Sequence, residues 1–266
     1  MHFKTSLIII IPKPNKEFYD SPKSFRPIIL LNTLGKLIEK VIGEYLQFYL
    51  ILNNFIHSCQ LDGLKQRSTI DAGVTLTHFI CLGWVKNNMT STLAFDIAQF
   101  FPLLNHHLLP LIFKKARYNS KVYYFFLNYL VGRKMWYCWN NFYSQLFNIN
   151  VGVGQGSVLF SILSTLYISP VFHILEKCLK NLKIPVSILL SVDNGLFVAQ
   201  SKSLTTSNSF YFCSYNIVSL FLKKFGLILE HGKTEVFHFS RSYGTFNPPP
   251  LNLSVLGGSL LRPKDT

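Results

Sequence analysis

Apolar and polar residues follow two different rhythms along this chain, and together they predict helices that alternate with strands. From Thr33 to Leu52 apolar residues recur three and four positions apart, with Lys36, Glu39, Lys40 and Glu44 between them, which predicts an amphipathic helix. The same spacing predicts helices over residues 70–86, 103–118, 122–130, 158–178 and 209–225. Runs rich in β-branched and aromatic residues predict strands or strand pairs over residues 6–12, 25–32, 93–95, 134–147, 188–198 and 227–239.

One of these stretches, Ile188 to Val198, sets a single carboxylate between two strand-forming runs. Asp193 is followed by Asn194 and Gly195, whose turn chemistry predicts a β-hairpin. Asparagine and glycine would be sufficient for the turn, whereas a metal site needs a carboxylate held on a rigid element. From these residues alone, an ordinary Asx turn and a metal-binding hairpin are equally good interpretations.

Two other stretches carry candidate chemistry. The apolar run from Leu93 to Phe95 delivers Asp96 at its end, and a carboxylate beside apolar neighbours is costly to bury unless it is paired or binds a cation. Gly152 to Ser157 is a glycine-rich loop before a helix, where backbone N–H groups can approach a phosphate or a base. The loop matches neither the dinucleotide-binding pattern nor a P-loop.

Basic and aromatic side chains could contact a polyanion, although each has a plainer explanation. Lys13 and Arg26 could grip phosphates, but a solvated basic loop explains them as well. The segment Gln66 to Thr69 offers donors to phosphates, but its position before a helix favours capping. The aromatic side chains that could either stack on bases or pack in a core are Trp136, Tyr137, Trp139 and Tyr143.

Composition narrows the class of protein. Among the 266 residues, 26 Lys and Arg oppose 12 Asp and Glu, and the resulting charge of +14 favours a polyanionic partner, with nucleic acid ahead of an anionic membrane. A content of 49% hydrophobic and 14% charged residues excludes a disordered chain. The five cysteines are widely spaced and indicate neither a disulfide framework nor a zinc site, so we expect an intracellular location, nuclear or cytoplasmic. The apolar runs are too short for a signal peptide or a span, so we expect no membrane partner.

The order of the motifs resembles the reverse transcriptase domain of non-LTR retrotransposons over nearly the whole chain. Any one motif could arise by chance, but their joint order and spacing identify the family. The matching segments, in chain order, are Ile10 to Pro14, Phe25-Arg26-Pro27-Ile28, Leu31-Asn32, Leu34-Gly35-Lys36, Glu39-Lys40, Gly63-Leu64, Gln66 to Thr69, Ala94 to Ile97, Phe100-Phe101, Asn105-His106, Gly152-Val153, Gln155-Gly156-Ser157, Val192-Asp193 and Lys233 to Val236.

This resemblance implies an α+β fold of the right-hand polymerase type, with fingers and a palm. An antiparallel palm sheet would pack on helices, and a thumb would be absent. The implied regions are fingers over residues 1–92, a palm over 93–241 with inserted helices at 103–130, and an irregular tail over 242–266 that stops before a thumb. The implied activity is RNA-directed DNA polymerisation with Mg²⁺, an RNA template, a DNA primer and deoxynucleoside triphosphates, while the oligomeric state is left open.

The resemblance also implies roles for individual residues. Asp96 and Asp193 match the two catalytic aspartates that ligate Mg²⁺, and Ile97 would add its backbone carbonyl to one metal ion. Lys233 matches the lysine that protonates the pyrophosphate leaving group. The residues that match the nucleotide-binding set, namely finger cations, the aromatic that closes the sugar pocket and the glycine loop, are Lys13, Arg26, Phe101, Gln155 and Gly156.

The chain departs from the family at the hairpin, where the pattern aromatic-x-Asp-Asp is replaced by Ser191-Val192-Asp193-Asn194. Asn194 keeps one oxygen acceptor at a catalytic position but loses the charge, and Ser191 removes an aromatic wedge. Phe160-Ser161 also stands where the family usually has Ser-Pro. These departures predict an impaired polymerase, with a catalytically dead nucleic-acid-binding remnant as the alternative and a translation product without a role as a third interpretation.

Overall fold

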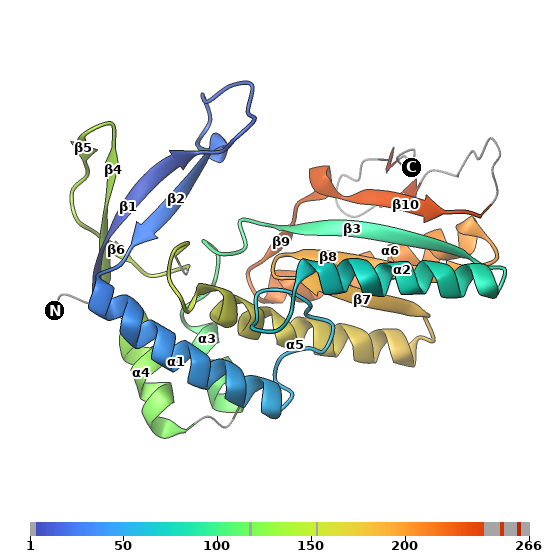
Figure 1. Ribbon diagram of the computed structural model, residues 1–266, viewed down its shortest axis with the longest axis horizontal. Coiled ribbons are helices and arrows are strands. Elements are labelled where there is room, and N and C mark those ends of the chain that lie inside the picture. Colours follow the sequence, from blue (N-terminus) through green and yellow to red (C-terminus); the bar gives the residue numbers. More distant parts are fainter. Residues whose placement is uncertain (1–3, 117–118, 153, 242–250, 253–259, 262–266) are drawn as a thin grey trace. The chain divides into compact units, whose positions relative to one another are not determined.

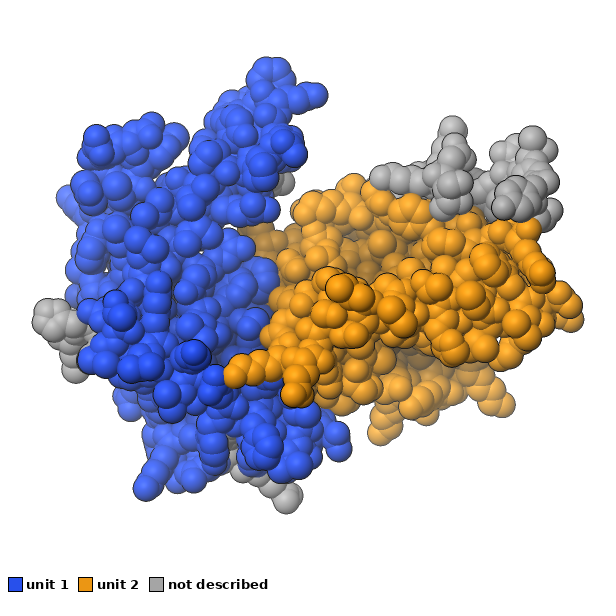
Figure 2. All heavy atoms as spheres, viewed as in Figure 1, with its two compact units in different colours: residues 1–55, 101–167 blue, residues 56–100, 168–266 orange. Residues whose placement is uncertain are grey.

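The elements that the sequence pattern predicts recur in the computed structural model, which describes residues 4–116, 119–152, 154–241, 251–252 and 260–261 (Figure 1). Two compact units, each made of two chain segments, contain these elements (Figure 2). Unit 1 comprises Met1–Phe55 and Phe101–Tyr167, and unit 2 comprises Ile56–Phe100 and Ile168–Thr266. Both contain helices and sheet, so the α+β prediction is confirmed. A boundary between fingers and palm at residues 92 and 93 stays a prediction.

Unit 1 is built on a mixed sheet with the strand order β2-β1-β4-β5, in which β6 also pairs with β4. β1 runs antiparallel to β2 and parallel to β4. A turn at Asn140 and Asn141, both with positive φ, splits the predicted aromatic strand into separate strands because asparagine tolerates the left-handed region. The strands are β1 Thr5–Pro12, β2 Phe25–Leu30, β4 Arg133–Trp139, β5 Phe142–Tyr143 and β6 Phe147–Ile149, and a short 3₁₀ turn, η2, covers Pro22–Ser24.

The helices of unit 1 agree with the predicted positions, although their burial differs from the expected pattern. They are α1 Thr33–Leu52, α3 Leu108–Lys115, α4 Ser120–Leu130 and the first part of α5 Phe160–Asn181. Helix α3 is shorter than predicted, and just before it the Asn105 side chain accepts a hydrogen bond from the His107 amide. In α1 the predicted polar residue Glu39 is buried, whereas apolar Leu37 and Val41 are exposed.

Unit 2 is built on an antiparallel sheet with the strand order β10-β3-β8-β7, and β9 pairs with the end of β3. Strand β3 is longer than predicted because its polar residues Thr90 to Thr92 are buried between neighbouring strands. The strands are β3 Met89–Ala98, β7 Val186–Ser191, β8 Asn194–Ser201, β9 Ile228–Leu229 and β10 Glu235–Phe239.

Helices cover both faces of this sheet (Figure 1). Helix α2, Thr69–Val85, lies on the face of Thr90, whose hydroxyl donates to the Phe79 carbonyl. Helix α6, Leu204–Lys224, lies on the opposite face, where the Tyr211 hydroxyl accepts from the Ala199 amide. The predicted capping role of Ser68 is confirmed, since its side chain and that of Asp71 form a capping box at the start of α2.

The start of α6 was predicted too late. The predicted helix covers residues 209–225, but α6 begins at Leu204, within the polar stretch 201–208. Its serines are satisfied locally, because the Ser207 hydroxyl pairs with that of Ser201 at 2.7 Å and the Ser214 hydroxyl donates to the Phe210 carbonyl. Gly226 follows the helix with φ of 73° and confirms the predicted end.

Among the described helices, α5 alone is long and apolar enough to cross a bilayer. In its most apolar stretch of 18 residues, 67% is buried within the protein, as in the core helices of soluble proteins.

The predicted irregular tail, 242–266, lies mostly outside the described residues. Within it, β11 Leu251–Asn252 pairs with β12 Leu260–Leu261.

Candidate active site

The predicted hairpin forms between β7 and β8, but its turn is placed differently from the prediction. The two turn residues are Val192, with φ of 55°, and Asp193, while Asn194 already belongs to β8 and pairs with Ser191. Gly195 is needed for packing, because a Cβ there would overlap the ring of Phe95 on the neighbouring strand. The hairpin therefore presents the Asp193 carboxylate at its tip.

Strand β3 brings Asp96 to this tip. Phe95 and Ile97 are buried, so the alternation of the strand turns Asp96 to the other face, where its side chain is 14% exposed. The Ile97 amide donates to the Asp193 carbonyl at 3.1 Å, and Asp96 is opposite Asn194 in the strand pairing. The two aspartates thus come from adjacent elements that are fixed by backbone hydrogen bonds.

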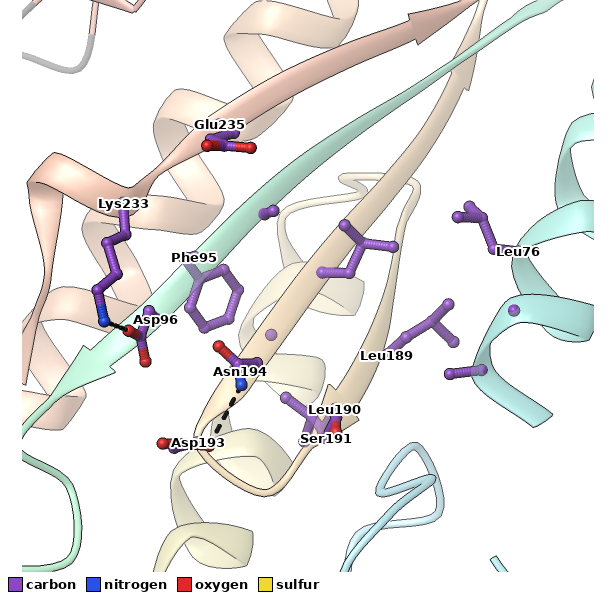
Figure 3. Close-up of a pocket in the computed structure, with 15 residues that line it drawn as sticks. Leu76, Phe95, Asp96, Leu189, Leu190, Ser191, Asp193, Asn194, Lys233 and Glu235 are labelled. Carbon is purple, nitrogen blue, oxygen red and sulfur yellow. Dashed lines mark hydrogen bonds and ion pairs between the residues drawn. The ribbon is translucent and has the colours of Figure 1, made fainter. Parts of the chain in front are cut away.

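Lys233 approaches Asp96 from a third element. It ends the 3₁₀ turn η3, His231–Lys233, and its ammonium group forms an ion pair with the Asp96 carboxylate (Figure 3). This hydrogen bond raises the pKa of Lys233. The turn is anchored by the buried Tyr215 hydroxyl, which lies 2.8 Å from His231 Nδ1 and 3.1 Å from the Thr234 hydroxyl.

Asp193 has an unfavourable electrostatic environment. Burial raises the pKa of Asp193, and the nearby charge of Asp96 adds to the rise. Within the described part of the chain, the side-chain donor that reaches its carboxylate is the Asn194 amide, at 3.3 Å. The negative charge at the tip is therefore only partly compensated by the protein itself.

These groups border an open pocket of about 690 Å³ in unit 2 (Figure 3). One side is formed by Ala72, Gly73 and Leu76 of α2, and the other by the hairpin. The acidic and basic side chains around it are Asp96, Asp193, Lys233 and Glu235. A polar end and an apolar wall allow the pocket to hold a ligand that has both charged and apolar parts.

A residue that sequence reasoning missed supports the hairpin. Ser191, which stands in place of the family's aromatic, donates to the Asp62 carboxylate at 2.9 Å. The segment around Asp62 also pairs with the β7 edge, since the Leu61 amide donates to the Leu190 carbonyl at 2.8 Å. Asp62 is not predictable from local pattern, because a lone Asp-Gly pair indicates only a turn.

The predicted nucleotide-binding residues all lie in unit 1. Lys13 and the exposed Arg26 lie at the same end of the β1–β2 ladder, where the Lys13 amide donates to the Ser24 carbonyl. The Gln155 carbonyl accepts from the Ile29 amide at 2.6 Å, so the glycine loop lines the same strand β2. Phe101 stacks on Phe160 at a centroid distance of 3.9 Å.

The aromatic strand region offers exposed rings rather than a packed core. Trp139, Phe142 and Tyr143 are 48%, 62% and 62% exposed. The interpretation of these rings as core residues is therefore wrong for Trp139 and Tyr143. Their exposure agrees with the other interpretation, stacking on bases, which stays a prediction.

An antiparallel sheet with two aspartates and a lysine at one end is typical of the palm in the fingers-palm fold of polymerases. A family model described as "Reverse transcriptase (RNA-dependent DNA polymerase)" matches residues 11–259. The chain belongs to the reverse transcriptase family.

Two relatives from Drosophila melanogaster carry transposon names. The chain is 30% identical over 166 residues to the probable RNA-directed DNA polymerase from transposon BS. It is 28% identical over 167 residues to that from transposon X-element. Each match covers 62% of this chain and 18% of the relative, so the chain spans only a small part of their length.

Two telomerases are among the solved structures that share this fold. A truncated apo telomerase from Candida tropicalis superposes with a TM-score of 0.66 at 17% identity, covering 92% of this chain and 52% of that one. A Candida albicans telomerase in complex with a telomeric RNA fragment gives a TM-score of 0.65 at 16% identity, covering 96% of this chain and 44% of that one. At these identities the likeness confirms the fingers-palm fold alone.

The raised pKa of Asp193 leads to a prediction about the stability of the folded protein. Because the folded-state pKa of Asp193 is raised, the folded protein binds more protons than the unfolded chain, and stability falls as pH rises from the ordinary aspartate value of 3.8 through the folded pKa. We expect Asp193→Asn to stabilise the metal-free protein at pH 7 by about 0.5–2 kcal/mol, the range for replacing a strained functional residue. Chemical denaturation at pH 7 and at pH 3.5 measures this difference, which should shrink at the lower pH.

The matched control is Asp20→Asn, which changes an exposed carboxylate and should shift stability by less than about 0.5 kcal/mol. Equal effects of the two substitutions, or a loss of stability at pH 7 in Asp193→Asn, would contradict the prediction.

Proposed function

We propose that this chain is the polymerase core of a retrotransposon reverse transcriptase, which extends a DNA primer on an RNA template with deoxynucleoside triphosphates. The single observation that supports this most is the meeting of Asp96, Asp193 and Lys233 at one pocket in a chain of this family. The two Drosophila relatives are named as probable RNA-directed DNA polymerases from transposons, which fits the same activity. In this proposal residues 1–92 act as fingers and residues 93–241 as palm.

The family generally uses divalent metal ions, and the donors at this site fit Mg²⁺. Asp96 and Asp193 supply hard carboxylate oxygens, and burial, with the nearby Asp96 charge, raises the pKa of Asp193, so a bound cation would stabilise its charged form. Among the described residues no three His, Cys, Asp or Glu side chains are grouped to hold a metal, so the carboxylates number two. The Ile97 carbonyl would complete the set. When bound, Mg²⁺ would lower the pKa of the primer 3′-hydroxyl and neutralise the triphosphate.

The remaining residues have proposed roles that need no metal. Lys233 donates its proton to the leaving pyrophosphate, and its raised pKa keeps it protonated at neutral pH. Lys13 and Arg26 contact triphosphate oxygens by charge-assisted hydrogen bonds. Phe101 limits the space at the sugar 2′-position. Gln155 and Gly156 support the nucleotide and the template.

Primer extension tests both the proposed polymerase activity and the effect of Asn194 at the hairpin. We expect the wild-type chain to extend a DNA primer on RNA slowly, and Asn194→Asp to extend it about 10- to 100-fold faster, the usual effect of a residue that supports a metal site. The reason is position, because residue 194 is opposite Asp96 and its amide contacts Asp193. The measurement is the extension rate as a function of Mg²⁺ concentration, with the half-saturating concentration falling in Asn194→Asp.

Asn148→Asp is the matched control, since it adds the same charge at an exposed position of β6. Salt-dependent binding of the primer-template without extension, by both the wild type and Asn194→Asp, would contradict the polymerase and favour a nucleic-acid-binding remnant.

A further inference from the structure

Helix α1 buries a carboxylate that the proposed chemistry does not use. Glu39 is 3% exposed, and burying an ionised carboxylate costs several kcal/mol unless donors surround it. Three donors do so here. The Tyr129 hydroxyl donates to Oε1 at 2.5 Å, and the Ser157 hydroxyl and Val158 amide donate to Oε2 at 2.7 and 3.0 Å.

Two of these donors belong to the end of the glycine loop. Ser157 directly follows Gln155 and Gly156, and its own hydroxyl accepts from the Leu159 amide at 3.2 Å. Helix α5 begins at Phe160, so the Glu39 carboxylate lies at the amino end of a long helix, where a negative charge is favoured. Glu39 therefore ties α1 to the junction between the loop and α5.

The other side of the loop is fixed to β2. The Ile29 amide donates to the Gln155 carbonyl at 2.6 Å. Gly156 has φ of 109°, and a Cβ there would lie 2.5 Å from the Ile29 carbonyl oxygen, so only glycine allows this approach. The pair Gln155-Gly156 is thus held between a strand on one side and the Glu39 carboxylate on the other.

Tyr129 and Arg133 complete the surroundings of Glu39. Burial raises the pKa of Tyr129 to about 12, so the hydroxyl keeps its proton and donates it. The Arg133 guanidinium lies 4.4 Å from the centre of the Tyr129 ring and is itself buried, which brings a positive charge near Glu39. The ion pairs of the described residues include none to Glu39, so its charge is balanced by hydrogen bonds and by this cation.

We propose that Glu39 is a positioning residue that holds the Gln155-Gly156 loop in the conformation needed to receive the nucleotide. The proposal rests on the proposed function, because the role of the loop comes from it. Glu39 does not touch the substrate; it acts through Ser157 and Val158. A helix-capping role alone would stabilise α5 without changing how the loop meets a nucleotide.

Two measurements on the full chain separate these roles. In Glu39→Ala, hydrogen exchange of the Gln155 to Val158 amides should accelerate about 10- to 100-fold, as expected when hydrogen bonds to a charged group are lost. In primer extension, KM for the deoxynucleoside triphosphate should rise about 10-fold while kcat changes less than about 3-fold, since a positioned loop contributes to binding. Glu39→Gln keeps the shape and an acceptor and should recover most of both effects.

Glu44→Ala, an exposed glutamate on the same helix, is the matched control and should change neither measurement. Ser157→Ala removes one loop bond while leaving the buried carboxylate in place, and it covers the case in which Glu39→Ala does not fold; the same two effects are expected at about 3- to 10-fold.

The two proposals can fail separately. A wild-type chain that does not extend a primer contradicts the proposed function, whereas the exchange of Gln155 to Val158 still decides whether Glu39 holds the loop. Unchanged exchange at these amides, or a drop in kcat with unchanged nucleotide KM, overturns the role of Glu39.

Discussion

Asp96→Asn is expected to lower kcat for primer extension by about 10³-fold or more. A carboxylate that binds a catalytic metal ion supplies several kcal/mol of transition-state stabilisation, and each 1.4 kcal/mol changes the rate tenfold. Asp96 lies at the centre of the site, because it forms an ion pair with Lys233 and is opposite Asn194 of the hairpin in the strand pairing. Steady-state extension at saturating Mg²⁺ measures the effect.

The fold should survive this substitution. The Lys233 partner is 67% exposed, so their ion pair contributes no more than about 1 kcal/mol to stability. A second measurement, a Mn²⁺ titration followed by electron paramagnetic resonance, should show that Asp96→Asn binds Mn²⁺ more weakly than the wild type. Glu235→Gln is the matched control, since it neutralises another carboxylate of the pocket and should change kcat less than about 3-fold. Extension that is unaffected by Asp96→Asn would rule out the metal-site assignment.

Most of the fold could be predicted because its elements carry strong local signals. Helix α1 has the predicted bounds, and the hairpin around Asp193 lies between two β-branched runs. Two of the errors, the late predicted starts of β3 and α6, have one cause, which is that polar residues were left out of the predicted elements. Thr90 to Thr92 are buried inside β3, and the serines of α6 bond to neighbours within the helix or beside it. Tertiary hydrogen bonds decide such positions, and periodicity does not report them.

The sequence predicted individual site residues where the chemistry requires a particular side chain. Asp96, Asp193 and Lys233 were singled out by the order of motifs, and the structure brings them to one pocket. Residues that act through another side chain were given no role. Glu39 belongs to the matching segment Glu39-Lys40, but its polar position on an amphipathic helix predicted exposure, and Asp62 belongs to no matching segment. Both depend on contacts more than 100 residues away in the chain, at Ser157 and Ser191 respectively.

At the hairpin, Ser191 and Asn194 differ from the family pattern, and both make hydrogen bonds that hold the turn. In place of an aromatic wedge, Ser191 holds the hairpin to Asp62 by a hydrogen bond, so the position of the tip is kept by polar contacts. In place of a carboxylate, Asn194 donates to Asp193. The hairpin is therefore held by polar contacts, while Asn194 gives the site one negative charge fewer than the family pattern.

Lys233→Ala is expected to lower kcat by about 10²- to 10⁴-fold, the usual contribution of a positioned general acid. The ammonium group is placed by η3, which Tyr215 anchors, and it is kept protonated because its hydrogen bond to Asp96 raises the pKa of Lys233. Binding of the primer-template should weaken little, since one exposed cation contributes about one unit to the salt slope. Single-turnover extension as a function of pH, together with binding isotherms, measures both effects.

The pH dependence distinguishes an acid from a simple positive charge. The wild-type rate should fall at alkaline pH as Lys233 loses its proton. Lys233→Ala should lack this alkaline fall. Lys223→Ala, which removes an exposed lysine of α6 in the same unit, should leave both the rate and the profile unchanged. A Lys233→Ala variant within about 3-fold of the wild-type kcat would show that the proton for pyrophosphate comes from another donor, and Lys233 would then act only as the ion-pair partner of Asp96.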